Sequence, residues 1–180
     1  MKLAFAAAAI CALALPSAVS AQDVKITLDQ TLVENFDGDA VTQALAPFNA
    51  TVTPQKAADG SPSFKIAFPG GLNAVATPTA CSDDKAHTGC TGLKVQAFFS
   101  LPEGKTPADM AAIVNGFNAG HEATTAVYDQ KGTTRLTRYI VSQFGITRTN
   151  LSIELYTFRR SAQVWSETLF AKPAAAKKGA

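Results

Sequence analysis

The chain has 180 residues, of which 47 % are hydrophobic and 17 % are charged, and its formal net charge is +2. This length suits one ordinary domain, and the composition allows a packed core and argues against an intrinsically disordered chain. The nearly neutral charge gives no electrostatic reason to expect nucleic-acid binding, which needs a clustered basic surface.

The first 21 residues have the three parts of a secretory signal peptide. Lys2 supplies the positive charge, residues 3–15 form an apolar run, and Pro16 ends that run ahead of the small side chains around Ala21. Cleavage is expected after Ala21. The alternative, a transmembrane anchor, needs about 20 apolar residues, more than this run contains. We therefore predict a periplasmic or secreted protein without membrane insertion after cleavage.

Two cysteines, Cys81 and Cys90, remain after the signal peptide is removed. In an oxidising compartment such a pair favours a disulfide, and closing a short loop stabilises a fold by about 2–3 kcal/mol. The alternative is a metal site in which both thiolates, His87 and Asp83 or Asp84 are ligands, but this spacing matches no zinc pattern. We predict the disulfide, no bound metal and no cofactor.

The hydrophobic periodicity predicts the elements in chain order. Residues 23–35 fit either a short strand or a helical turn, and a helix follows with Asp37 or Asp39 as its N-cap. From residue 49 apolar residues alternate with polar ones, which predicts strands near 51–53, 63–68, 72–79 and 93–99.

A second helix is predicted from Pro107 to Gly120, with Thr106 as N-cap and one apolar stripe. A hairpin of strands 124–128 and 133–141 follows, and a long helix begins near Thr149. Residues 22–171 are expected to form one domain, and 172–180 a disordered tail. This order predicts the α+β class: an antiparallel sheet with helices packed on one face.

The arginines and histidines suggest no definite chemistry. The arginines form either a basic patch or, as we favour, ordinary surface charge; they are Arg135, Arg138, Arg148, Arg159 and Arg160. Alternation places Arg138 on an apolar strand face, where it needs a buried or interfacial partner. A hydrolase using His121 with Glu122 or Tyr128 is the least favoured alternative, because no catalytic motif accompanies His121. We predict no catalytic residues.

Two asparagines, Asn115 and Asn118, lie three residues apart near the end of the second helix. A side-chain amide there can cap the last turn or bond to a neighbouring strand, and this structural role is favoured over ligand binding.

Several short motifs occur in a fixed order along residues 60–165. They are Ser61-Pro-Ser-Phe-Lys-Ile66, Cys90 followed by Leu93-Lys-Val-Gln-Ala-Phe-Phe99, Val114-Asn-Gly-Phe-Asn118 and Ala126-Val-Tyr-Asp129. In this order they resemble the YbjN family, a bacterial sensory transduction regulator group. The chain departs from the family where Gly120-His121-Glu122 replaces basic residues, and at Arg135 and Arg138, where acidic residues are common.

The resemblance implies a fold similar to that of type III secretion chaperones, often dimeric, and a non-catalytic regulatory or chaperone-like role. We predict an exported YbjN-like domain that binds a protein partner or a second copy of itself. The candidate binding or structural residues are Asn115, Asn118, Tyr128 and Trp165. The alternative is a small apolar ligand in a cavity lined by Phe64, Phe99 and Trp165.

Overall fold

The computed structural model describes residues 26–129 and 132–171. The predicted signal peptide and the predicted tail lie outside these residues, so both stay predictions. Within the described ranges, no helix is both long enough and apolar enough to cross a membrane. The elements in chain order are β1 (Leu32–Val33), α1 (Gly38–Leu45), the 3-10 helix η1 (Ala46–Phe48), β2 (Thr51–Lys56), β3 (Pro62–Ala67), β4 (Asn73–Asp83), β5 (Thr88–Ser100), α2 (Pro107–Gly120), β6 (Thr125–Tyr128), β7 (Thr133–Val141), β8 (Ile146–Thr147) and α3 (Arg148–Leu169).

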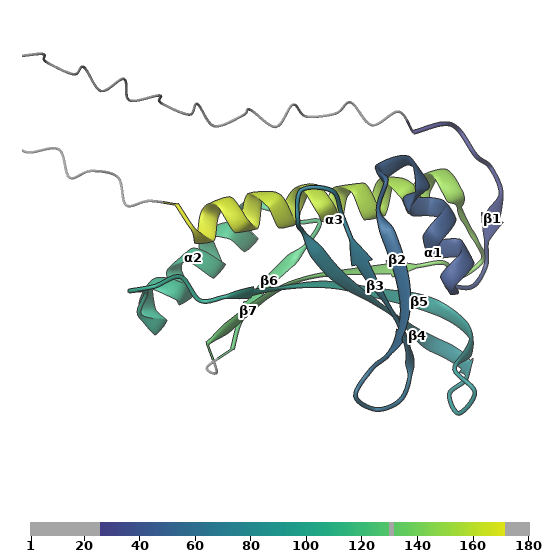
Figure 1. Cartoon of the computed structure of the whole chain (residues 1–180), viewed down its shortest axis with the longest axis horizontal. Coiled ribbons are helices and arrows are strands. Elements are labelled where there is room, and N and C mark those ends of the chain that lie inside the picture. The colour runs from purple at the N-terminus through teal and green to yellow at the C-terminus, as the bar shows by residue number, and fades with distance from the viewer. Residues whose placement is uncertain (1–25, 130–131, 172–180) are drawn as a thin grey trace, which may run out of the picture.

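The central feature is a six-stranded antiparallel sheet with the strand order β2-β3-β4-β5-β7-β6 (Figure 1). The long strands β4, β5 and β7 form its middle, and β1 and β8 pair separately at one end. The predicted α+β class and antiparallel sheet are confirmed.

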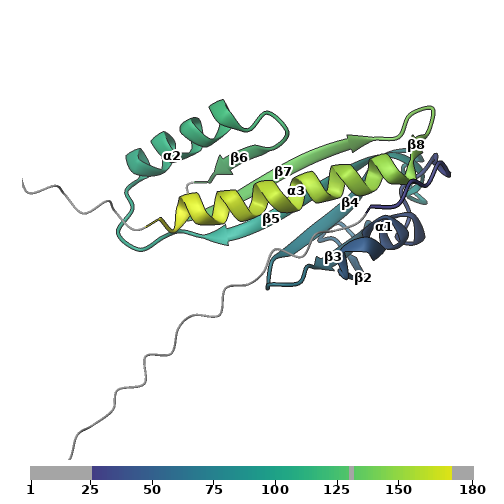
Figure 2. The ribbon, with the colours of Figure 1, turned by 90° about the horizontal axis from the view of Figure 1, so that it is seen from above.

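The hydrophobic core lies between this sheet and α3, which runs along one face of the sheet (Figure 2). Alternate residues of β5 and β7 point into the core because successive side chains of a strand face opposite sides. The buried stripe of α3 is the predicted one, and its members are Leu151, Leu155, Phe158, Ala162, Trp165 and Leu169.

The segment before α1 takes the strand form rather than the helical turn that the sequence also allowed. Leu32 and Val33 pair with Thr147 and Ile146 of β8. Nearby, the Arg148 guanidinium lies 2.5 Å from the Asp29 carboxylate. Long-range pairing with β8 therefore decides a conformation that local periodicity left open.

The helix starts follow the predicted caps closely. Asp37 caps α1 by accepting a hydrogen bond from the Ala40 amide at 2.8 Å, while Asp39 lies in the first turn. Thr106 and Asp109 form a capping box at the start of α2. The last helix starts at Arg148, one residue before the predicted Thr149, because the Thr147 side chain is its N-cap.

The capping box predicts a pH effect on stability. Hydrogen bonds from the backbone and hydroxyl of Thr106 hold the pKa of Asp109 below its usual value. A carboxyl whose pKa is lower in the folded state stabilises the fold above its unfolded pKa of about 3.9, and this stabilisation is lost as the pH falls through the folded pKa. The stability gap between the wild type and Asp109→Asn should therefore shrink as the pH falls from about 5 to about 2.

Urea unfolding at several pH values measures this gap. Glu103→Gln, which removes an exposed carboxyl outside the capping box, is the matched control. A gap for Asp109→Asn that stays constant across this pH range would show that the ionised carboxylate contributes nothing to the cap.

Candidate binding surface

The side of the six-stranded sheet that faces away from α3 is not covered by any described helix. We call this surface the open face and define it by the alternation and register of the strands. Its residues are Lys65, Val75, Thr77, Thr79, Gly92, Lys94, Gln96, Phe98, Thr125, Val127, Arg135, Thr137, Tyr139 and Val141.

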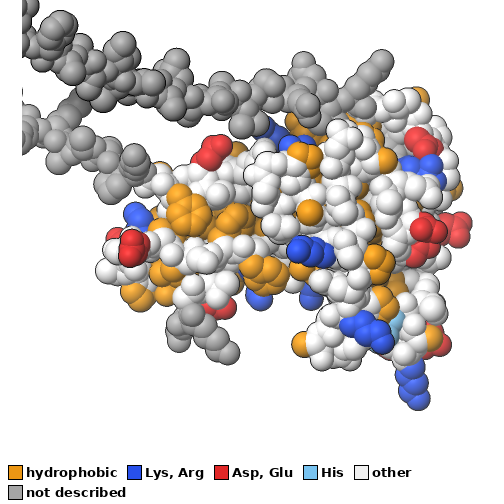
Figure 3. Space-filling view, viewed as in Figure 1, with side chains coloured by type: hydrophobic (Ala, Val, Ile, Leu, Met, Phe, Trp, Pro, Cys, Tyr) orange, Lys and Arg blue, Asp and Glu red, His pale blue; other side chains and the backbone are white. Residues whose placement is uncertain are grey.

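Large apolar side chains on the open face reach into solvent. Phe98, Tyr139 and Val141 are 54 %, 54 % and 52 % exposed. Figure 3 shows hydrophobic side chains beside Lys and Arg side chains below β5 and β7, on the side away from α3. A single exposed apolar residue is ordinary, and three on one sheet face make that face a candidate interaction surface.

The paired residues of β5 and β7 on the open face, which we call the seam, follow a repeating pattern of side-chain types. Lys94 lies directly opposite Tyr139, and Phe98 lies directly opposite Arg135. Between the two pairs, the Gln96 side-chain amide donates a hydrogen bond to the Thr137 hydroxyl at 3.1 Å. The seam therefore carries two pairs of a cation and an aromatic ring, one on each side of a polar pair.

Contacts with the neighbouring strands β4 and β5 hold the Tyr139 side chain in place. The Thr79 hydroxyl donates a hydrogen bond to the Tyr139 hydroxyl at 3.2 Å. A Cβ at Gly92 would lie 2.1 Å from the Tyr139 hydroxyl oxygen and 2.6 Å from the Thr79 hydroxyl oxygen. Gly92 thus leaves the space in which the Tyr139 side chain lies across β5.

We expect Gly92→Ala to displace Tyr139 and to cost about 1 kcal/mol of unfolding free energy, since the added methyl meets the end of a movable side chain. Tyr139→Phe is the comparison, because it removes the hydroxyl and keeps the ring; it should cost about 0.5–1 kcal/mol. Urea unfolding gives both values, and NMR of the ring protons follows the position of residue 139. Unchanged ring signals in Gly92→Ala would contradict the placement of the Tyr139 hydroxyl over Gly92.

Of the predicted site residues, Asn118 has the clearest role. Its side chain accepts a hydrogen bond from the Ala126 amide at 2.8 Å and donates one to the Ala126 carbonyl at 3.0 Å. Because β6 is an edge strand, the Asn118 amide occupies the hydrogen-bonding positions that a further strand would use. Asn115, by contrast, is exposed on α2.

Trp165 belongs to the interior, and Tyr128 is half-buried at its edge. Tyr128 packs against the hydrophobic core from β6, and Trp165 is fully buried on α3. The Trp165 ring meets the Phe117 ring edge to face, with their centroids 4.8 Å apart. Neither side chain is presented to a partner on the open face.

The side chains expected to line a ligand cavity do not lie around one. Phe64 and Trp165 belong to one continuous buried cluster, and Phe99 packs against it. Two open hollows, of about 570 and 320 Å³, lie instead beside the segment before α1 and the start of α3. No described contact favours the apolar-ligand alternative.

His121 is held at the end of α2 by its own helix. Its Nδ1 lies 3.0 Å from the Phe117 carbonyl oxygen and donates to it, since a carbonyl only accepts. The imidazole also stacks on the Phe117 ring with a centroid distance of 4.1 Å. These contacts orient the ring against α2, and Glu122 is exposed.

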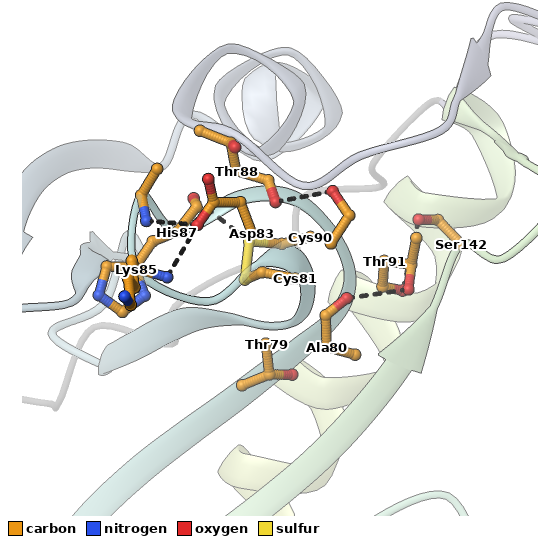
Figure 4. The surroundings of a disulfide bond; sticks show 12 residues. Thr79, Ala80, Cys81, Asp83, Lys85, His87, Thr88, Cys90, Thr91 and Ser142 are labelled. Atoms are coloured by element: carbon orange, nitrogen blue, oxygen red, sulfur yellow. Dashed lines mark hydrogen bonds between the residues drawn. A yellow bond between two sulfur atoms is a disulfide. The ribbon is translucent and has the colours of Figure 1, made fainter.

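Cys81 and Cys90 form a disulfide between directly paired residues of β4 and β5 (Figure 4). The strands continue beyond it to Asp83 and from Thr88, so the segment between the cysteines is a tight hairpin rather than a flexible loop. Sulfurs joined to each other are not thiolate ligands, which removes the basis of the metal alternative.

The disulfide also fixes a junction between distant segments. The Phe36 amide donates to the Cys90 carbonyl at 2.8 Å, and the Ser142 amide donates to the Thr91 carbonyl at 2.8 Å. The hairpin end is therefore attached both to the segment before α1 and to the end of β7.

The arginines do not gather into one patch. Arg138 extends from β7 to form an ion pair with Glu154 of α3, and its Nε lies 2.6 Å from the carboxylate. Arg148 pairs with Asp29, and the Arg159 guanidinium lies 5.9 Å from the centroid of the Phe68 ring. Arg138 thus has the interfacial partner that its strand position required.

The open face was not predicted from the sequence. The signal was present at Phe98, which falls on the same side of its strand as Lys94 and Gln96. Tyr139 and Val141 likewise fall on the polar side of β7. An aromatic residue at a polar position of an amphipathic strand is the pattern that would have identified this surface.

Comparisons with known proteins show a likeness of fold. No protein-family model matches the chain, and no curated protein matches it in sequence. Among solved structures, the chain is similar to the crystal structure of YbjN from E. coli, described as "a putative transcription regulator". The TM-score is 0.53 at 14 % sequence identity, over 77 % of this chain and 92 % of that one. The fold is therefore YbjN-like, while the family membership that the motifs indicate stays a prediction.

Proposed function

We propose that the chain is an exported, non-catalytic binding module that receives a protein partner on the open face of its sheet. The observation that carries this proposal is the exposure of Phe98, Tyr139 and Val141 together on a sheet face that no described helix covers. Aromatic residues are enriched at protein interfaces because they bury a large area for few rotatable bonds.

The similar structure, YbjN from E. coli, is described as a regulator, which agrees with a binding or regulatory role. The likeness of fold does not identify a particular role. Export is supported by the signal-like residues 1–21 and by the Cys81–Cys90 disulfide, which suits an oxidising compartment. A non-catalytic role is supported by the contacts of His121, which are made with its own helix.

A comparison of partners recovered from the cell envelope tests the proposal. The double variant Phe98→Ser/Tyr139→Ser removes both aromatic rings of the open face. The matched control is Ile153→Ser/Phe170→Ser, which removes two exposed apolar side chains at the opposite, helical layer. We expect at least one protein that the wild type and the control retain in equal amounts to be reduced at least tenfold with the open-face variant.

Circular dichroism must show the same fold for all three proteins. A set of retained partners that is identical for the open-face variant and the control would contradict docking on the open face.

A further inference from the structure

The chemistry of the open face narrows the kind of partner that it fits. Its middle strand positions include three cations, Lys65, Lys94 and Arg135. The carboxylates that alternation places on the same side, Asp83 and Asp129, lie at its two ends. The middle of the face is therefore positively charged, although the whole chain is nearly neutral.

The two cations of the seam have no ion-pair partner among residues 26–129 and 132–171. The ion pairs in those ranges join Arg138 to Glu154 and Arg148 to Asp29. Lys94 and Arg135 instead lie opposite the exposed rings of Tyr139 and Phe98. Each pair offers an anionic group one cation without an ion pair in the described ranges and one aromatic ring. Asp129 lines a small hollow beside Phe98 and Arg135, so this end of the face is less positive than the end at Lys94.

The spacing of the two pairs fits an extended polypeptide. Lys94 is opposite Tyr139, which is four residues from Arg135 on β7, so the two cations are separated by about 14 Å. An extended chain covers about the same distance between residues i and i+4, and its alternate side chains point to one side. Two acidic residues four apart would thus meet Lys94 and Arg135, and the residue between them would face the polar pair.

We propose that the open face binds an extended acidic segment of a protein partner, with carboxylates at positions i and i+4 placed on Lys94 and Arg135. This inference rests on the proposed function and adds the chemistry of the partner. A second copy of this chain is a poor occupant of the same face, because it would bring Lys94 and Arg135 against like charges. A long polyanion such as single-stranded nucleic acid would also run over Asp83 and Asp129 at the ends of the face.

NMR titration of the full mature chain with synthetic peptides tests this proposal by measuring the affinity for each peptide. The first peptide has two glutamates four residues apart, leucine at the alternate positions outside them, and threonine elsewhere, including the position that faces the polar pair. A second peptide has lysines in place of the glutamates, and a third keeps both glutamates but places them two residues apart. We expect the first peptide to bind at least tenfold more tightly than either of the others, with shifts confined to β4, β5 and β7.

Variants then connect this binding to the two cations. Lys94→Gln/Arg135→Gln should weaken binding of the first peptide at least tenfold, and raising the salt from about 0.05 to about 0.5 M should weaken it at least fivefold. The matched control is Lys56→Gln, which removes an exposed cation from the end of β2 and should change the affinity less than twofold.

Each outcome decides between the two proposals. No binding of the first peptide at millimolar concentration, or equal binding of the lysine peptide, overturns the acidic segment. Tighter binding of a ten-nucleotide oligothymidine or of phosphatidylglycerol vesicles would overturn it in favour of a nucleic acid or a membrane surface. If the peptide fails while Phe98→Ser/Tyr139→Ser still loses a cellular partner, the open face remains a docking site and only the acidic chemistry is wrong.

Discussion

Trp165→Ala is expected to lower the unfolding free energy by about 3–5 kcal/mol, the range for removing a buried aromatic side chain from a core. Trp165 is fully buried, and its ring meets Phe117 of α2 edge to face. Its removal would leave a cavity between α2, α3 and the sheet. Urea unfolding followed by circular dichroism measures the loss, because Trp165 is the only tryptophan of the chain and its fluorescence disappears with it.

Trp165→Phe is the matched control. The Trp165 Nε1 has no hydrogen-bond partner in the part of the chain that the structure describes, so phenylalanine loses buried volume but no hydrogen bond. We expect it to cost about 1–2 kcal/mol. A loss below about 1 kcal/mol for Trp165→Ala would instead mean that the indole is not a core side chain, and would restore it as a ligand-binding candidate.

Arg138→Ala is expected to lower the unfolding free energy by about 2–3 kcal/mol. The Arg138 and Glu154 side chains are 13 % and 32 % exposed, so their ion pair is mostly shielded from water. The guanidinium also donates to the Ala123 carbonyl. Removing the cation leaves the Glu154 carboxylate poorly solvated and unpaired, which is the main cost of breaking a buried pair.

The double variant Arg138→Leu/Glu154→Leu provides the comparison. Replacing a buried ion pair by apolar side chains is often close to neutral, so this variant should be more stable than Arg138→Ala. Urea unfolding of the two single variants and the double variant gives the coupling energy. Simple additivity of the single losses would show that the pair contributes no coupling between β7 and α3.

Much of the fold follows from patterns that one sequence contains. The stripe from Leu151 to Leu169 predicts α3 and its buried side, because a 3.6-residue period determines which side chains share a face. The cap at Thr106 and the alternation in β5 predict their elements for equally local reasons. Long-range pairing does not follow in this way, and the strand form of Leu32 and Val33 depends on β8, more than 100 residues away.

The site was harder to predict because it depends on which sheet face is left uncovered. Alternation separates the two sides of β5, but only the packing of α3 on one of them makes Phe98 a surface residue. The sequence predicts that Asn118 caps the last helical turn or bonds to a strand, and its bonds to Ala126 depend on how α2 lies against β6. The sequence around Gly92 does not predict that a larger residue would clash there, because the clash is with Tyr139 on the neighbouring strand.

Site-specific photo-crosslinking in the producing cells tests docking on the open face most directly. A benzophenone side chain placed at Phe98 samples the open face, and the same group at Ile153 samples the helical layer. Docking on the open face predicts an adduct with a partner protein from position 98 and none from position 153. Adducts from position 153 alone, or from neither position, would contradict it.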